Sequence, residues 1–210
     1  MQTISLEQMA AFMRLSAQEF EQNLDRLSAL DAALGDGDHG VTMVKGYRAL
    51  LAMMDAQEFT DIGSMWMEAG KTLVKEMGGT CGPLFGTIYL KGGMLSKGKT
   101  EVTLEELANM LTQGNNGVKA MGKANVGDKT MIDALEPGAL ALAAAAGSGK
   151  DLATALEEAY QASVQGAEAT CDMLATRGRG RYQGEGSKGH QDAGATSVTV
   201  LFHTLWCAVQ

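Results

Sequence analysis

The sequence predicts an all-α protein, and three observations lead to that prediction. Alanine, leucine and methionine are abundant while only 5% of the residues are aromatic, which is a composition typical of helices. Apolar residues recur at helical spacing over long stretches. Alternation of apolar and polar residues at the period of a strand is sustained nowhere. We therefore expect one domain, residues 1–210, built from about eight helices.

The first helix is expected to begin at a capping box formed by Ser5 and Gln8. The apolar stripe that follows has spacings of four and three residues, and it consists of Phe20, Leu24, Leu27, Leu30 and Leu34. We expect this helix to end at Gly35. Helices over residues 41–54 and 61–77 follow it.

The remaining helices are marked by proline and by capping residues. They are expected over residues 83–95, 103–121, 130–146 and 151–174, and from 192 to the C-terminus. Pro83 is well placed in a first helical turn, Thr103 and Glu106 form a second capping box, and Asp151 is a good N-cap. Pro137 either kinks the helix that contains it or divides that helix in two.

Composition excludes several classes of protein. The net charge of −8 argues against a nucleic-acid groove, although an acidic protein can bind a polyphosphate when metal ions carry the positive charge. Three cysteines without CxxC spacing argue against a disulfide framework or structural zinc and indicate a reducing compartment. No apolar run reaches the ~20 residues of a membrane span, and no signal pattern opens the chain. We expect a cytoplasmic protein with no membrane partner.

The most informative feature is an acidic turn that contains Asp31, Asp36 and Asp38 within eight residues. Carboxylates so close together repel one another unless a cation lies between them. Hard oxygen ligands favour Mg2+ or Ca2+. Ordinary turn chemistry would explain one or two of these aspartates, and the EF-hand pattern is excluded because no glutamate stands at its twelfth position. We interpret the turn as a metal site.

Glycine-rich turns supply a second clue. They lie at residues 35–40, 78–86, 114–127, 178–189 and 194. Antiparallel neighbouring helices bring alternate loops to the same end of a bundle. Glycine lets backbone N–H groups approach a phosphate there, and the following helix adds its positive dipole end. We expect a nucleotide site at one rim, without a P-loop.

Two lysine- and arginine-containing segments need separate interpretations. Residues 93–100 match the Walker pattern GxxxxGK[ST], but the next helix is capped at Thr103, so we interpret them as a polar loop. Residues 177–181, Arg-Gly-Arg-Gly-Arg, are either a solvated loop or a phosphate clamp. His39 and His190 are acid–base groups, donors to a phosphate or structural histidines. Cys81 has no histidine partner in the sequence, which argues against a nucleophilic role.

Four stretches together resemble one known family. They are Gly35-Asp-Gly-Asp-His-Gly40, Gly78-Gly-Thr-Cys-Gly-Pro-Leu-Phe-Gly-Thr87, Gly127-Asp-Lys-Thr-Met131 and Gly189-His-Gln-Asp-Ala-Gly-Ala-Thr-Ser197. In this order they resemble the nucleotide-binding L subunit of dihydroxyacetone kinase, the DhaL or DAK2-domain family.

The resemblance implies a barrel of eight antiparallel helices with the nucleotide at one rim. It implies that Asp31, Asp36 and Asp38 hold Mg2+ ions bridging the phosphates of ADP or ATP. The other residues that it places at the nucleotide are His39, Gly40, Val41, Thr42, Thr80, Cys81, Gly122, Met131, Arg179, Asp192, Ala193 and Gly194. Gly122 and Met131 would border the adenine. Thr42, Cys81 and Ala193 differ from the asparagine, serine and proline expected of the family.

The resemblance also implies Mg-dependent phosphoryl transfer to dihydroxyacetone held on a separate K subunit. We favour ADP as a bound cofactor that a phosphohistidine protein of the phosphotransferase system, an M subunit, rephosphorylates. The alternatives are an exchanging ATP-dependent kinase for dihydroxyacetone or a related ketose, and a non-catalytic ADP-bound module that contacts a transcriptional regulator. A metal-binding helical protein without nucleotide would leave the glycine-rich loops unexplained.

Overall fold

The computed structural model describes residues 3–210 and confirms the all-α prediction. The α-helices are α1 (Leu6–Gln22), α2 (Leu24–Leu34), α3 (His39–Ala56), α4 (Ile62–Glu76), α5 (Cys81–Leu95), α6 (Leu104–Gly122), α7 (Ile132–Gly147), α8 (Leu152–Ala169) and α9 (Ala193–Cys207). Two 3-10 helices, η1 (Thr170–Asp172) and η2 (Gly180–Ser187), lie between α8 and α9. The strands β1 (Thr3–Ser5) and β2 (Glu101–Thr103) pair in an antiparallel ribbon.

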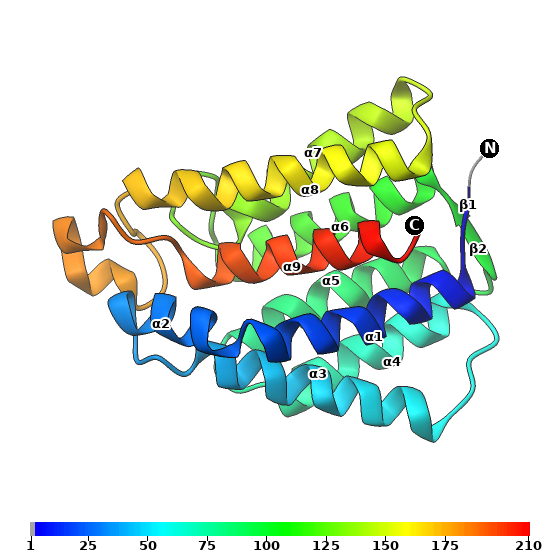
Figure 1. Cartoon of the computed structure of the whole chain (residues 1–210), viewed down its shortest axis with the longest axis horizontal. Coiled ribbons are helices and arrows are strands. Elements are labelled where there is room, and N and C mark those ends of the chain that lie inside the picture. Colours follow the sequence, from blue (N-terminus) through cyan, green and yellow to red (C-terminus); the bar gives the residue numbers. More distant parts are fainter. Residues whose placement is uncertain (1–2) are drawn as a thin grey trace.

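The helices pack as a closed ring around one apolar core. Going round the ring, α3, α4, α5, α6, α7, α8 and α9 each pack on the next, and α1 closes it by contacting both α9 and α3. Figure 1 shows these helices running side by side along the long axis of the molecule, with α2 continuing beyond α1. Inside the ring, the buried rings of Phe12, Trp66 and Tyr89 lie against one another. None of the described helices has the length and apolarity that a membrane crossing requires.

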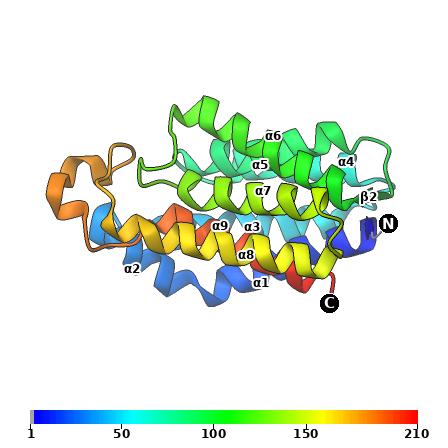
Figure 2. The ribbon, with the colours of Figure 1, turned by 90° about the horizontal axis from the view of Figure 1, so that it is seen from above.

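The connections divide between two opposite ends of the ring. Residues 35–38, 77–80, 123–131 and 170–192 connect helices at one end, which we call the loop rim. The ribbon of β1 and β2 and the C-terminus lie at the other end, the sheet rim, as the two perpendicular views show (Figures 1 and 2). Antiparallel packing therefore brings four connections to one face, as the spacing of the glycine-rich turns predicted.

Helices that begin at the two rims start differently. At the sheet rim, α1, α4, α6 and α8 are each capped by their own N-cap side chain, namely Ser5, Asp61, Thr103 and Asp151. The two predicted capping boxes are confirmed. At the loop rim, α3 and α5 begin without any hydrogen bond from an N-cap side chain. Except for the N–H of His39, which donates to Asp31, their first-turn N–H groups therefore remain available for an anion.

The structure corrects the predicted helix boundaries at two places. The first predicted helix is two helices, because the backbone leaves helical geometry at Asn23 (φ −95°, ψ 6°), whose side-chain Nδ2 bonds to the carbonyl of Glu19. The helix expected to reach Leu174 ends at Ala169, where the hydroxyl of Thr170 bonds back to the carbonyl of Ala167.

Two further features were left open or missed by the sequence. Pro137 lies inside the single helix α7, so the alternative of two helices is wrong. The ribbon of β1 and β2 was missed because each strand has only three residues, too few for alternation to show.

Candidate functional site

A cavity of about 480 Å³ opens at the loop rim, and helix ends and loops from most of the ring line it. The predicted site residues that line it are Asp31, Asp36, Asp38, His39, Thr42, Thr80, Cys81, Gly122, Met131, Arg179, Asp192, Ala193 and Gly194. The structure therefore brings together residues from five separate stretches of the chain.

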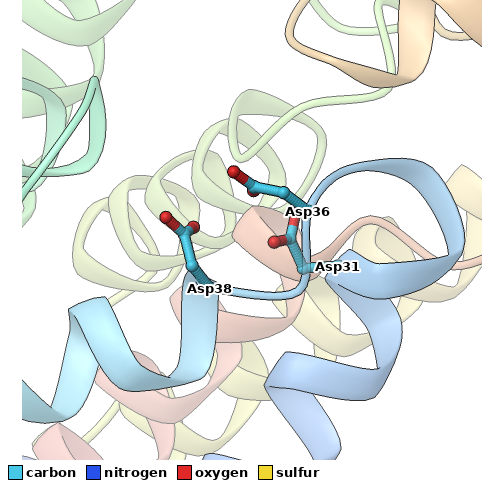
Figure 3. Close-up of side chains that lie close together, drawn as sticks. All are labelled: Asp31, Asp36 and Asp38. Atoms are coloured by element: carbon cyan, nitrogen blue, oxygen red, sulfur yellow. The ribbon is translucent and has the colours of Figure 1, made fainter.

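The three aspartates form a compact carboxylate cluster at the edge of this cavity. One oxygen from each lies within 4.8 Å of the others, and Figure 3 shows the side chains converging from the last turn of α2, the following loop and the start of α3. Asp31 is half-buried, and its Oδ2 accepts a hydrogen bond from the N–H of His39 at 3.3 Å. Asp36 and Asp38 are exposed. Three convergent carboxylates suit a hard divalent cation.

Glycine shapes this turn at one position in particular. Gly37 has φ +77°, a left-handed conformation that glycine adopts at little cost. The turn at Gly37 lets Asp36 and Asp38 present their carboxylates to the same space as Asp31 (Figure 3). Local sequence and local geometry together therefore build the cluster.

His39 connects three parts of the site. Its ring is buried, with Nε2 2.7 Å from the hydroxyl of Ser197 on α9 and Nδ1 3.5 Å from the thiol of Cys81 on α5. Burial lowers the pKa of His39, although Asp31 and Asp38 act in the opposite direction. The imidazole is therefore a neutral hydrogen-bonding group, and Ser197, to which sequence reasoning assigned no role, holds one of its two nitrogens.

The thiol of Cys81 is poorly suited to attack a substrate. Burial, with a contribution from Asp38 and Asp31, raises its pKa to about 12. Because the thiolate is the nucleophilic form, Cys81 is a protonated wall residue at neutral pH. The structure does place a histidine, His39, beside this thiol, but the raised pKa argues against a nucleophilic role for Cys81.

Arginines and apolar side chains line different parts of the cavity. Arg177, Arg179 and Arg181 come from the connection between η1 and α9, and the guanidinium of Arg179 forms an ion pair with Asp36. Apolar side chains come from α5, α6 and α7 and from the loop before α7, and they are Leu84, Phe85, Val118, Met121, Ala124, Met131 and Ile132. The cavity thus joins an apolar wall to a strongly charged edge.

Two of the predicted residues lie beside the cavity rather than among its lining. Gly40 is buried where α3 crosses α2, and a Cβ atom there would lie 2.2 Å from the carbonyl oxygen of Leu24. Its glycine is therefore needed for close helix packing. Val41 is 57% exposed in the first turn of α3.

The structure adds residues that the sequence did not single out. Lys129 lines the cavity yet is only 2% exposed, and its Nζ donates to the carbonyls of Thr170 and His190. Asp133 is buried and accepts from the backbone N–H groups of Gly127 and Thr130. In the sequence, Lys129 could have been found from its place in the Gly127–Met131 motif, whereas Asp133 lies outside that motif. Nothing near either residue in the chain indicated its hydrogen-bond partners.

The Walker-like segment takes no part in this site. Its first residue, Gly93, lies inside α5, and β2 rather than a helix follows Thr100. Lys99 precedes β2, the strand at the sheet rim, by two residues and pairs with Glu106 at 2.6 Å. The interpretation of this match as a polar loop is therefore consistent with its position.

Comparisons with known proteins agree with this architecture. The sequence matches the DAK2 domain family over residues 33–207. It is 35% identical over 208 residues, 99% of each chain, to the ADP-binding subunit DhaL of the PEP-dependent dihydroxyacetone kinase of Escherichia coli (strain K12). It is 31% identical, over 90% of each chain, to the ADP-binding subunit DhaL of the PTS-dependent dihydroxyacetone kinase of Lactococcus lactis subsp. lactis.

A solved structure shares the fold. The dihydroxyacetone kinase of C. freundii in complex with AMP-PNP and Mg2+ superimposes with a TM-score of 0.73 at 28% identity, covering 97% of this chain and 34% of that chain. This chain therefore corresponds to about a third of that larger kinase. The match over residues 33–207 and the full-length relatives show that the chain belongs to the DAK2-domain family, alongside the DhaL subunits of dihydroxyacetone kinases.

Proposed function

We propose that this chain is the nucleotide-binding subunit of a dihydroxyacetone kinase and that it binds ADP or ATP with Mg2+ in the loop-rim cavity. The observation that carries the proposal is the carboxylate cluster of Asp31, Asp36 and Asp38 at the charged edge of a cavity whose other wall is apolar. A nucleotide has the same two parts, an aromatic base and an anionic polyphosphate.

The apolar wall suits the adenine. Met131 and Gly122 are the predicted adenine neighbours, and Leu84, Val118 and Ile132 extend the same wall from three adjacent helices. A base on this wall would direct its phosphates towards α3 and α5. The starts of these two helices have no hydrogen bond from an N-cap side chain. Apart from the N–H of His39, which donates to Asp31, they offer free N–H groups and the positive ends of two helix dipoles.

The residues present fit a magnesium ion. The three aspartates would hold it through oxygen atoms, which are its preferred ligands. When bound, the ion neutralises charge on the β- and γ-phosphates and orients them for transfer. The protein supplies the remaining elements: Arg179 lies next to Asp36 and can pair with phosphate oxygens through its planar fork, and neutral His39 adds no charge of its own.

The phosphoryl acceptor is proposed to be dihydroxyacetone held on a partner K subunit that docks on the loop rim. Large apolar side chains are exposed around that rim, and they are Val41, Met121, Val126, Leu174 and Tyr182. Such side chains next to a polar cavity suit a protein–protein contact. A related ketose such as erythrulose is the alternative acceptor, since erythrulose kinases are also among the relatives.

The nucleotide is proposed to be a retained ADP cofactor, rephosphorylated by a phosphohistidine protein, the M subunit of the phosphotransferase system. The names of the full-length relatives support this version, because they describe PEP- or PTS-dependent kinases with an ADP-binding subunit. An ATP-exchanging kinase is the competing version, and contact of the ADP-bound rim with a transcriptional regulator is a further partner to test.

Native mass spectrometry of the chain as purified, without added nucleotide, tests the proposal. We expect a mass excess equal to ADP plus magnesium, which would support a retained cofactor and a phosphohistidine donor. A bare chain that binds added Mg-ATP would instead support the exchanging kinase. A bare chain that binds neither Mg-ADP nor Mg-ATP would overturn the nucleotide site.

A further inference from the structure

The arginines at the cavity lie on a long surface loop that carries little regular structure apart from η2. This arginine loop, residues 173–189, leaves the chain after η1 and returns shortly before α9. Two bonds close its neck: the N–H of Gly189 donates to the carbonyl of Cys171 at 2.7 Å, and the N–H of Ala175 donates to the hydroxyl of Ser187 at 3.0 Å. Arg177, Arg179 and Arg181 are exposed, so packing alone does not fix them.

Lys129 forms hydrogen bonds to both sides of this neck. Its Nζ donates to the carbonyl of Thr170, just before the loop. The same Nζ donates to the carbonyl of His190, just after the loop, at 2.5 Å. The side chain is 2% exposed, and a buried ammonium is costly unless its hydrogen bonds are satisfied. The backbone of Lys129 has φ +60°, which is uncommon for a residue with a Cβ atom. The chain therefore maintains an unfavourable conformation and a buried charge at this position.

Asp128 holds the outgoing limb of the same loop. Its carboxylate accepts from the hydroxyl of Thr176, and its carbonyl accepts from the N–H of Thr176 at 3.2 Å. The same carboxylate lies 3.8 Å from Nε of Arg177. Two adjacent residues of the connection between α6 and α7 thus contact the arginine loop at its neck and at its first arginine.

We propose that Asp128 and Lys129 form a clamp that fixes the arginine loop over the cavity, and that they act as positioning residues for Arg177 and Arg179. The inference rests on the proposed function, because the arginines are taken to contact the phosphates of the nucleotide. Loosening the clamp should therefore weaken binding of the distal phosphates without changing the base pocket.

Limited trypsin digestion measures how firmly the clamp holds the arginine loop, because trypsin cleaves after arginine. In Lys129→Met and Asp128→Ala, cleavage after Arg177, Arg179 and Arg181 is expected to be about tenfold faster than in the unaltered chain, since local opening exposes these bonds. Lys150→Met is the matched control, because Lys150 is an exposed lysine that pairs with Glu158 away from the cavity. Mass spectrometry of the early fragments gives the rate at each bond.

Nucleotide affinity then separates positioning from general damage. We expect the Kd for Mg-ADP to rise about tenfold in both variants, while the Kd for AMP changes less than about threefold, because the arginines act on the distal phosphate. Equal loss of both affinities would overturn the positioning role, as would faster cleavage with unchanged Mg-ADP affinity.

Two variants are used so that the test still stands if one of them fails to fold. Lys129→Met alters a buried residue, whereas Asp128→Ala alters a side chain that is 21% exposed. Unchanged cleavage in both folded variants would overturn the clamp. If the unaltered chain bound no Mg-ADP, the proposed function would fail, whereas the cleavage rates would still decide whether the clamp exists.

Discussion

At the scale of single residues, Asp36 is the aspartate whose role is best separated from folding. It is exposed, and its carboxylate pairs with Arg179, whereas Asp31 also accepts from the backbone of His39. Under the proposed function, magnesium and Arg179 would be alternative cations for the same oxygen atoms. A bound ion would free Arg179 to pair with a phosphate.

Asp36→Asn is therefore expected to weaken Mg-dependent ADP binding by at least about tenfold, because loss of a metal-site group typically costs 10–100-fold. The helical circular-dichroism signal should not change. Isothermal titration with Mg-ADP gives the affinity. Lys99→Ala is the control, since Lys99 precedes β2, the strand at the sheet rim, by two residues and forms a surface pair with Glu106. Full affinity in Asp36→Asn would contradict the metal assignment, and loss of binding in Lys99→Ala would restore the Walker interpretation.

Gly40 illustrates a residue that serves packing next to the site. A Cβ atom at this position would lie 2.2 Å from the carbonyl oxygen of Leu24 and 3.0 Å from the backbone nitrogen of Ser28. Both are backbone atoms, which cannot move aside as a side chain can. The glycine in the acidic motif thus lets α3 approach α2 and brings Asp38 close to Asp31.

Gly40→Ala is expected to lower the free energy of unfolding by about 1–3 kcal/mol, the usual cost of overpacking. Urea denaturation followed by circular dichroism measures it. Gly147→Ala is a matched control, because no atom lies within 4 Å of a Cβ atom placed there. Equal stability of the two variants would show that α2 and α3 can separate freely.

At the scale of elements, the capping of a helix start depends on whether the helix begins at the sheet rim or at the cavity. Side chains cap the helices of the sheet rim, where water is the alternative partner, and α3 and α5 are left open at the cavity. Helix α9 is the exception among the cavity helices, because Asp192 caps it by accepting from the N–H of Ala195 at 2.7 Å. Burial raises the pKa of Asp192 to about 6, and Asp133 and Asp31 contribute in the same direction.

This raised pKa makes stability depend on pH in a definite direction. Between pH 3.8, the ordinary pKa, and about 6 the folded state binds more protons at Asp192 than the unfolded state. The contribution of this carboxyl is therefore fully present below pH 3.8 and is lost as pH rises through about 6.

Asp192→Asn keeps the cap but removes the titration. Relative to the unaltered chain, its free energy of unfolding should rise by about 1–2 kcal/mol between pH 4 and pH 6.5, somewhat less than the full shift implies because the carboxyl is partly exposed. Urea denaturation of both chains at the two pH values gives this difference. A difference that does not change with pH would contradict the raised pKa.

At the scale of the whole molecule, ligand binding at one rim should stabilise the entire ring. The apolar core is one continuous cluster with members from every α-helix, and the cavity is lined by several of those helices. A ligand that binds only the folded chain therefore opposes unfolding of the whole ring.

Mg-ADP at about one hundred times its Kd is expected to add about 2.7 kcal/mol and to raise the Tm by about 5–10 °C for a chain of this size. Differential scanning calorimetry of nucleotide-free protein checks this shift, and EDTA should abolish it. A shift that persists in EDTA would mean that the nucleotide binds without the metal.

Signals that act over a few residues were readable from the sequence alone. Helical composition, the two capping boxes and the aspartate cluster all depend on neighbours within about two turns of chain. They therefore predicted the fold class and the convergence of the three carboxylates. For the same reason, the sequence predicted that Asp151 caps a helix and that the Walker-like segment is not a phosphate-binding loop. The predicted nucleotide contacts came from a family resemblance, and they remain proposals here.

Only the tertiary structure decided which distant groups meet. Several contacts join residues far apart in the chain. They are the pairing of β1 with β2, the contact of His39 with Ser197, and the hydrogen bonds of Lys129 to Thr170 and His190. No periodicity records such contacts, because they depend on the order in which helices close the ring. The sequence thus determined the helices and the acidic turn, while packing determined that one rim became a cavity with an arginine loop held over it.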